Sequence, residues 1–120
     1  MELNKEAKKD ILNGFIDILT RISSREFQKR VWIRGEGPEC DSFDDVVCEF
    51  FGEDEAILAK YKDFGITDFQ YQLLVKFRDA FRAFTDKNNY PEKFIDTPEW
   101  TRITEMAKEV LKAFNYQKTR

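Results

Sequence analysis

The chain has 120 residues, of which 42% are hydrophobic and 36% charged, the composition of one globular domain. It has no histidine, which excludes His-dependent catalytic triads and the zinc and di-iron sites that need imidazole. Cys40 and Cys48 are too few for a zinc cluster or a disulfide scaffold. No apolar run approaches the roughly 18 residues of a membrane-spanning helix. We therefore expect one cytoplasmic domain over residues 1–120, without metal, cofactor or membrane partner.

The chain opens with a strongly amphipathic segment. Asn4 is placed to cap a helix, and apolar residues recur at helical spacing from Ile11 to about Ile22. Gly14 interrupts this helix and costs about 1 kcal/mol relative to alanine. We interpret Gly14 as the mark of a close helix crossing.

A second helix and a sharp turn follow. Ser23 and Glu26 have the spacing of a capping box, which predicts a helix over about residues 24–33. Two glycines and a proline within residues 35–38 then break the helical pattern. Trp32, just before this turn, is either a core residue or an interface anchor.

The middle of the chain predicts two further helices. Ser42 and Asp45 have capping-box spacing, and the helix that they begin is expected to end at Gly52. A shorter helix is predicted over residues 53–63. Cys48 lies next to apolar neighbours in the first of these helices, and we interpret it as a small core residue.

The last part predicts the two remaining helices. Thr67 is placed to cap a long helix over about residues 68–86, and residues 88–91 break it. Thr97 followed by Pro98 is typical of a helix start. Together the predicted elements make a compact all-α bundle of about six helices.

Negative charge is concentrated in one segment. Residues 36–55 contain nine acidic and no basic residues, whereas each flanking region has an excess of three basic residues. Burial of so many like charges would oppose folding, so we expect the segment at the surface. The acidic residues are Glu36, Glu39, Asp41, Asp44, Asp45, Glu49, Glu53, Asp54 and Glu55.

Two interpretations of this acidic segment stand side by side. Asp44 and Asp45, like Asp54 and Glu55, fall in the first turns of predicted helices, where the helix dipole favours carboxylates. Capping does not explain the acids of residues 36–41, or the absence of lysine and arginine. The second interpretation is therefore a docking surface for a basic partner.

Other chemistries fit the sequence poorly. The acids do not follow the order of a calcium-binding loop, and spacing alone does not show a glycosidase pair. The glycines at 35 and 37 lack the lysine of a phosphate-binding loop. Basic residues on the second helix (Arg25, Lys29, Arg30 and Arg34) could suggest nucleic-acid binding, but a pI near 5.1 argues against it.

Part of the sequence resembles small helical immunity proteins of bacterial contact-dependent growth inhibition systems. The resemblance combines a basic helix, a tryptophan, a Gly-x-Gly-Pro-acid turn, and an acidic helix with paired aromatic residues. It rests on residues 24–39, on residues 42–45, and on Phe50 and Phe51.

The resemblance implies a non-enzymatic inhibitor that binds the C-terminal domain of a cognate toxin in the cytosol. Many such toxins are nucleases, often RNases, whose active sites are basic because they hold phosphates. The residues expected to bind the toxin are Trp32, Glu36, Glu39, Asp41, Asp44, Asp45, Glu49, Glu53, Asp54 and Glu55. The alternatives are a helical adaptor or regulatory subunit for another basic protein, and a small enzyme of unfamiliar type.

Overall fold

The computed structural model describes residues 4–38 and 41–114. Within these residues the chain is helical and contains no strand, which confirms the predicted all-α class. The elements are α1 (Lys5–Ser23), α2 (Arg25–Phe27), the π-helix η1 (Gln28–Ile33), α3 (Phe43–Ala59), the 3₁₀ helix η2 (Tyr61–Phe64), α4 (Asp68–Thr85), α5 (Pro91–Phe94) and α6 (Pro98–Ala113).

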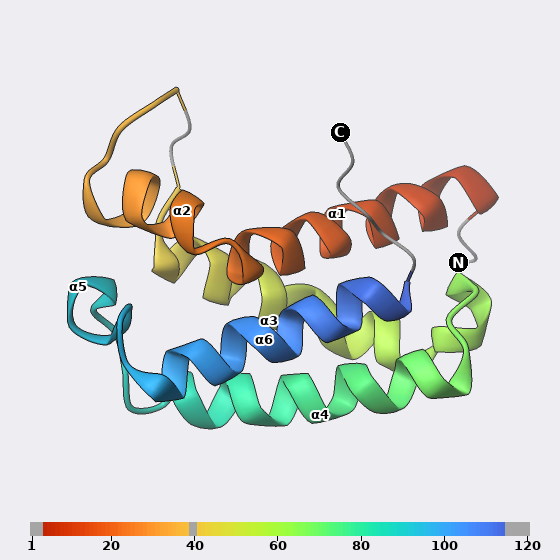
Figure 1. Cartoon of the computed structure of the whole chain (residues 1–120). Helices are drawn as coiled ribbons and strands as arrows, with labels where there is room; N and C mark the ends of the chain where they lie inside the picture. Colours follow the sequence, from red (N-terminus) through yellow and green to blue (C-terminus); the bar gives the residue numbers. More distant parts are fainter. Residues whose placement is uncertain (1–3, 39–40, 115–120) are drawn as a thin grey trace.

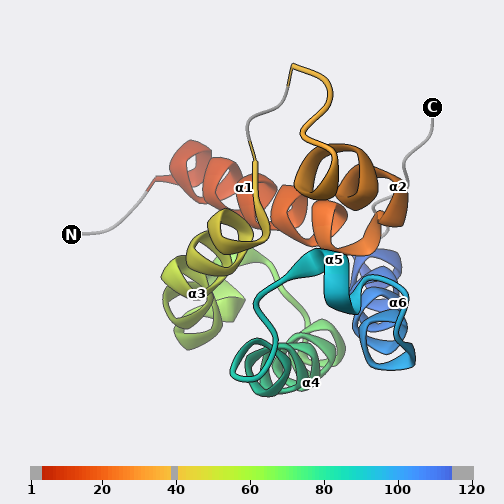
Figure 2. The same ribbon diagram turned by 90° about the vertical axis from the view of Figure 1, so that its left-hand side faces the viewer.

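The four long helices form an up-down-up-down bundle (Figure 1). Seen from one end, α1, α3, α4 and α6 stand in a ring in that order, so α3 and α6 are diagonal to each other (Figure 2). Each of these helices packs against its two neighbours in the ring. The turn at residues 35–38 stands away from the bundle at the end where α2 and α5 lie.

Local capping chemistry begins the long helices. The side chains of Asn4, Ser42, Thr67 and Thr97 each accept a hydrogen bond from a backbone N–H in the following turn, as the sequence predicted. The second helix differs by one residue: Ser24, and not Ser23, accepts from the N–H of Phe27.

Aromatic side chains fill the core. Phe50, near the middle of α3, stacks on Phe15 of α1 with ring centroids 5.0 Å apart. The same ring meets Phe77 and Phe81 of α4 edge-on, at 5.5 and 5.4 Å. Such pairs add to the hydrophobic gain of burying large rings. Phenylalanines from α1, α3 and α4 thus meet in the middle of the bundle.

One buried polar side chain joins the first helices to α6. Gln28 is fully buried, and its Nε2 donates to the carbonyl oxygens of Arg21 and Ile22 at the end of α1. Its Oε1 accepts from Nε1 of Trp100, at 2.8 Å. Because a buried polar side chain needs hydrogen-bond partners, these bonds satisfy Gln28 and tie α1 to α6.

The predicted division of residues 42–63 into two helices is wrong. α3 continues through Gly52 to Ala59, and only the 3₁₀ helix η2 follows, ending at Gly65 with a φ of 78°. Phe50 and Ile57, on either side of Gly52, are both fully buried. Their packing holds the helix together across a residue that disfavours it, as tertiary contacts commonly do. The sequence also gave no sign of the short helix α5.

Candidate acidic docking surface

The exposed side of α3 carries acids and no base. Its buried side, which includes Phe43, Val46, Phe50 and Ile57, faces the other helices. Helical spacing therefore turns the residues between these positions toward solvent. The acidic residues on that exposed side are Asp44, Asp45, Glu49, Glu53 and Glu55. By contrast, α1, α4 and α6 each mix both signs of charge.

Four of these carboxylates have no ionic partner within the described part of the chain. Asp44 and Asp45 lie in the first turn of α3, where the helix dipole stabilises them. Glu53 and Glu55 lie two turns further on, where the dipole no longer accounts for them. No ion pair joins any of the four to a lysine or arginine among residues 4–38 and 41–114.

Arg21 of α1 neutralises two of the predicted partner-binding residues. Its guanidinium lies 2.8 Å from an oxygen of Asp41 and 2.7 Å from Oε1 of Glu49, and it also pairs with Asp17 at 3.2 Å. The Arg21 side chain is only 17% exposed. Asp41 and Glu49 are thus engaged in joining α1 to the start of α3.

Trp32 is partly buried and packs against the edge of the core. Its ring packs against Phe43 and Trp100, with centroids 5.6 and 6.2 Å away, and its Nε1 donates to Asp41 at 2.7 Å. Burial raises the pKa of Asp41, opposed by this hydrogen bond and by the Arg21 charge. Trp32 thus contacts the core while part of its side chain stays exposed, so both interpretations of this residue remain open.

Asp54 is buried, contrary to the expectation that the whole acidic segment lies at the surface. Its exposure is 0%, and neither of its side-chain oxygens has a hydrogen-bond partner in the described chain. The nearest cation is Arg82 of α4, 3.7 Å away, which also lies over the ring of Phe51. Because α3 does not restart at residue 53, Asp54 and Glu55 are not in a first turn, and position 54 faces inward.

The turn before α3 is partly neutralised by its own neighbours. Glu36 pairs with Arg34 at 3.4 Å. Arg25 and Lys29 pair with Asp96 at 2.9 and 3.6 Å. The basic residues of the second helix are therefore largely engaged within the fold. Glu39 and Cys40 lie outside the described residues.

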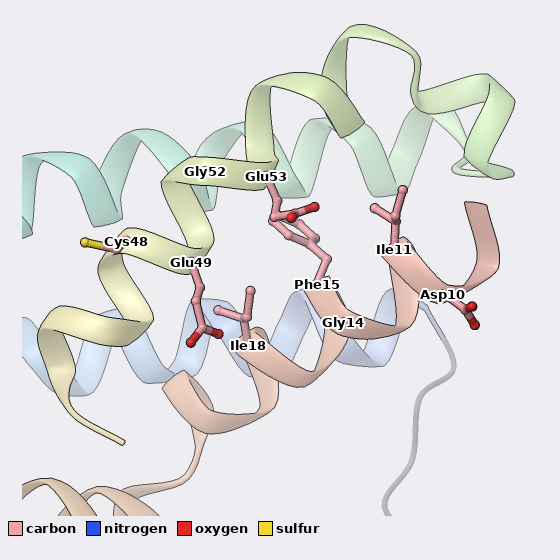
Figure 3. Close-up of a pocket in the computed structure, with 9 residues that line it drawn as sticks. All are labelled: Asp10, Ile11, Gly14, Phe15, Ile18, Cys48, Glu49, Gly52 and Glu53. Carbon is pink, nitrogen blue, oxygen red and sulfur yellow. The ribbon is translucent and has the colours of Figure 1, made fainter. Parts of the chain in front are cut away.

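A groove runs between α1 and α3 (Figure 3). Its volume is about 390 Å³. The residues that line it are Asp10, Ile11, Gly14, Phe15, Ile18, Cys48, Glu49, Gly52 and Glu53. Cys48 is exposed beside this groove, so its interpretation as a core residue is wrong. The sequence did not predict the groove, because it lies between two helices that are not consecutive in the chain.

Gly14 does not mark a close helix crossing. A Cβ placed on Gly14, or on Gly52 opposite, would meet no atom within 4 Å. Both glycines instead leave open space between α1 and α3. The groove is wide beside Gly14 and Gly52 because neither residue has a side chain to fill it.

Neither metal binding nor membrane insertion is indicated by the described residues. They contain no group of three or more His, Cys, Asp or Glu side chains arranged to hold a metal ion. None of the described helices combines the length and the apolar character needed to cross a lipid bilayer.

Comparison of the chain with models of protein families, with curated proteins and with solved structures finds no match. Function is therefore inferred from the acidic residues of α3 and from the sequence resemblance to immunity proteins.

Proposed function

We propose that the chain is an immunity protein that neutralises a cognate contact-dependent growth inhibition toxin, a nuclease acting on RNA. The exposed face of α3 would cover the basic, phosphate-binding region of the toxin. The observation that carries the proposal is a concentration of carboxylates without an ionic partner among the described residues: Asp44, Asp45, Glu53 and Glu55 share one helix that contains no basic residue.

The candidate binding residues differ in how available they are to a partner. Asp54 is buried, and Asp41 and Glu49 already pair with Arg21, so these three contribute less than the sequence suggested. Trp32 acts as a support: together with Arg21 it holds Asp41, the residue just before the cap of α3. The acidic face is thereby fixed on a rigid helix, which reduces the ordering cost of binding.

The expected mechanism is electrostatic capture followed by active-site occlusion. Complementary charge raises association rates from about 10⁵–10⁶ M⁻¹s⁻¹ toward about 10⁸–10⁹ M⁻¹s⁻¹ at low salt. Fast capture matters because each free nuclease molecule cleaves RNA until it is bound. Carboxylates at the phosphate-binding site would also compete with substrate for the same arginines and lysines.

The test begins with the gene directly before that of this chain, which the proposal expects to encode a large toxin. Its C-terminal domain is purified and assayed for RNA cleavage with and without an equimolar amount of this protein. We expect a stable one-to-one complex on size-exclusion chromatography and loss of cleavage.

Two results would count against the proposal. A preceding gene product that binds this protein but cleaves no nucleic acid would favour the adaptor function. A nuclease that remains fully active in the presence of this protein would contradict the inhibition directly.

A further inference from the structure

The groove between α1 and α3 has an apolar floor and an acidic rim. Phe15 and Ile18 form part of the floor and are almost completely buried. Glu49 and Glu53 extend from α3 toward α1 across the opening, whereas the carboxylate of Asp10 points away from it (Figure 3). Lysine and arginine are absent from the nine lining residues.

The two acids at the rim are not equivalent. Glu49 shares its Oε1 with Arg21, at 2.7 Å, so it is partly neutralised from the α1 side. Glu53, one helical turn further along α3, has no ionic partner among the described residues. An incoming cation would therefore find one unpaired carboxylate, with a second one beside it.

The shape of the groove depends on Gly14 and Gly52. Side chains at either position would project into the open space, since a Cβ there meets nothing within 4 Å. Both glycines lie inside helices, where alanine would be more favourable by about 1 kcal/mol. The helices thus carry a stability cost at the two positions that keep this groove open.

The geometry points to this groove as the receptor for an arginine side chain of the basic partner. The aliphatic stem of arginine can lie along Ile11, a partly exposed apolar residue of the lining, and its planar guanidinium can bind the carboxylate of Glu53 in a bidentate manner. Arginine is favoured over lysine because its guanidinium is more weakly hydrated and pairs better at partly buried sites. A volume of about 390 Å³ lies within the range of small-ligand sites.

This inference rests on the proposed function only in assigning the arginine to the toxin, so it is tested without the toxin. The probe is N-acetyl-arginine methylamide, titrated into the ¹⁵N-labelled full chain. We expect saturable NMR shifts at the amides of Gly14 and Gly52, with a millimolar dissociation constant. The lysine and norleucine derivatives serve as probes of the same backbone, and both should bind at least about fivefold more weakly.

Filling the groove provides the decisive variants. Gly52→Leu, and independently Gly14→Leu from the opposite wall, should weaken binding of the probe at least about tenfold while the helical circular dichroism is retained. Ala59→Leu places the same leucine side chain on the exposed side of α3 outside the groove, and it should leave binding unchanged.

Several results would overturn the assignment. They are the absence of saturable shifts, unaltered binding in both folded glycine variants, equal binding of the norleucine derivative, and equal binding of the lysine derivative. Such a result together with intact inhibition of the toxin would reject the groove as a receptor and leave the proposed function standing. If the groove still binds the probe but the protein does not inhibit the toxin, the groove stands as a receptor for arginine and the proposed function is rejected.

Discussion

At the scale of single residues, Asp54 is the clearest conflict between charge and position. Its carboxyl group is fully buried in α3 and lacks hydrogen-bond partners in the described chain. Burial raises its pKa, opposed first by the dipole of the nearby Glu55 backbone N–H and then by the Arg82 and Arg78 charges. When the pKa of an acid is higher in the folded than in the unfolded state, the protonated acid stabilises the fold. This contribution to the free energy of unfolding is complete below the unfolded-state pKa of about 3.9. That contribution is lost as the pH rises through the raised value.

Asp54→Asn should therefore stabilise the protein at pH 7, by about 1 kcal/mol, because the amide carries no charge to bury. The advantage over the parent chain should shrink as the pH falls, because Asp54 takes up a proton as the pH passes its raised pKa. Urea denaturation at pH 4, 5 and 7 measures this difference.

Asp79→Asn is the matched control, since its carboxylate is 65% exposed on α4 and its change should stay within about 0.5 kcal/mol at every pH. A less stable Asp54→Asn at pH 7 would show instead that attraction to Arg82 outweighs the cost of burial.

At the scale of elements, α3 stays helical along its whole length because its buried side packs against the bundle, and not because of its own helix propensity. Gly52 is a weak position in its centre, yet phenylalanine and isoleucine on both sides hold the helix against the bundle. Gly52 has helical backbone angles, and a Cβ added to it would contact no other atom, so a larger side chain fits there without a clash. Gly65, after η2, is different because its φ of 78° is one that other residues rarely adopt.

Gly52→Ala is accordingly expected to stabilise the protein by about 0.5–1 kcal/mol. Gly65→Ala provides the contrast and should destabilise it, by about 1 kcal/mol or more, because alanine is strained in the left-handed region. Chemical denaturation of the two variants beside the parent chain tests both signs. If Gly52→Ala instead destabilises the protein, a neighbouring atom must lie close enough to Gly52 to clash with the added methyl group.

At the scale of the whole molecule, the fold places several exposed acids on one helix that carries no base. α3 presents its exposed carboxylates on the corner of the bundle diagonal to α6, whose exposed residues have mixed charge. The field of such an asymmetric molecule orients an approaching basic partner toward α3. Orientation affects the association rate more than the final affinity.

Asp44→Asn combined with Glu55→Gln should slow association with the toxin domain about three- to tenfold at low salt. Neither residue lines the α1–α3 groove, so the variant addresses steering alone. Its rate should also depend less steeply on ionic strength, measured by stopped-flow fluorescence between about 0.02 and 0.3 M salt.

The control for steering is Glu105→Gln combined with Glu109→Gln, which removes the same charge from the exposed side of α6. Its association rate should stay close to that of the parent chain. Equal slowing by both pairs would mean that only net charge matters, and that the face of α3 has no special role.

The sequence by itself determined the helical class, the caps at Asn4, Ser42, Thr67 and Thr97, and the concentration of acids before and within α3. These features depend on local hydrogen bonding and on composition, which act within one or two helical turns.

Only the tertiary structure decided which acids are free, that Asp54 is buried, that Arg21 pairs with Asp41 and Glu49, and that Gly14 and Gly52 open a groove. Each of these depends on contacts between helices far apart in the chain. Burial and ion pairing are properties of the space between helices, and a local sequence pattern does not specify that space.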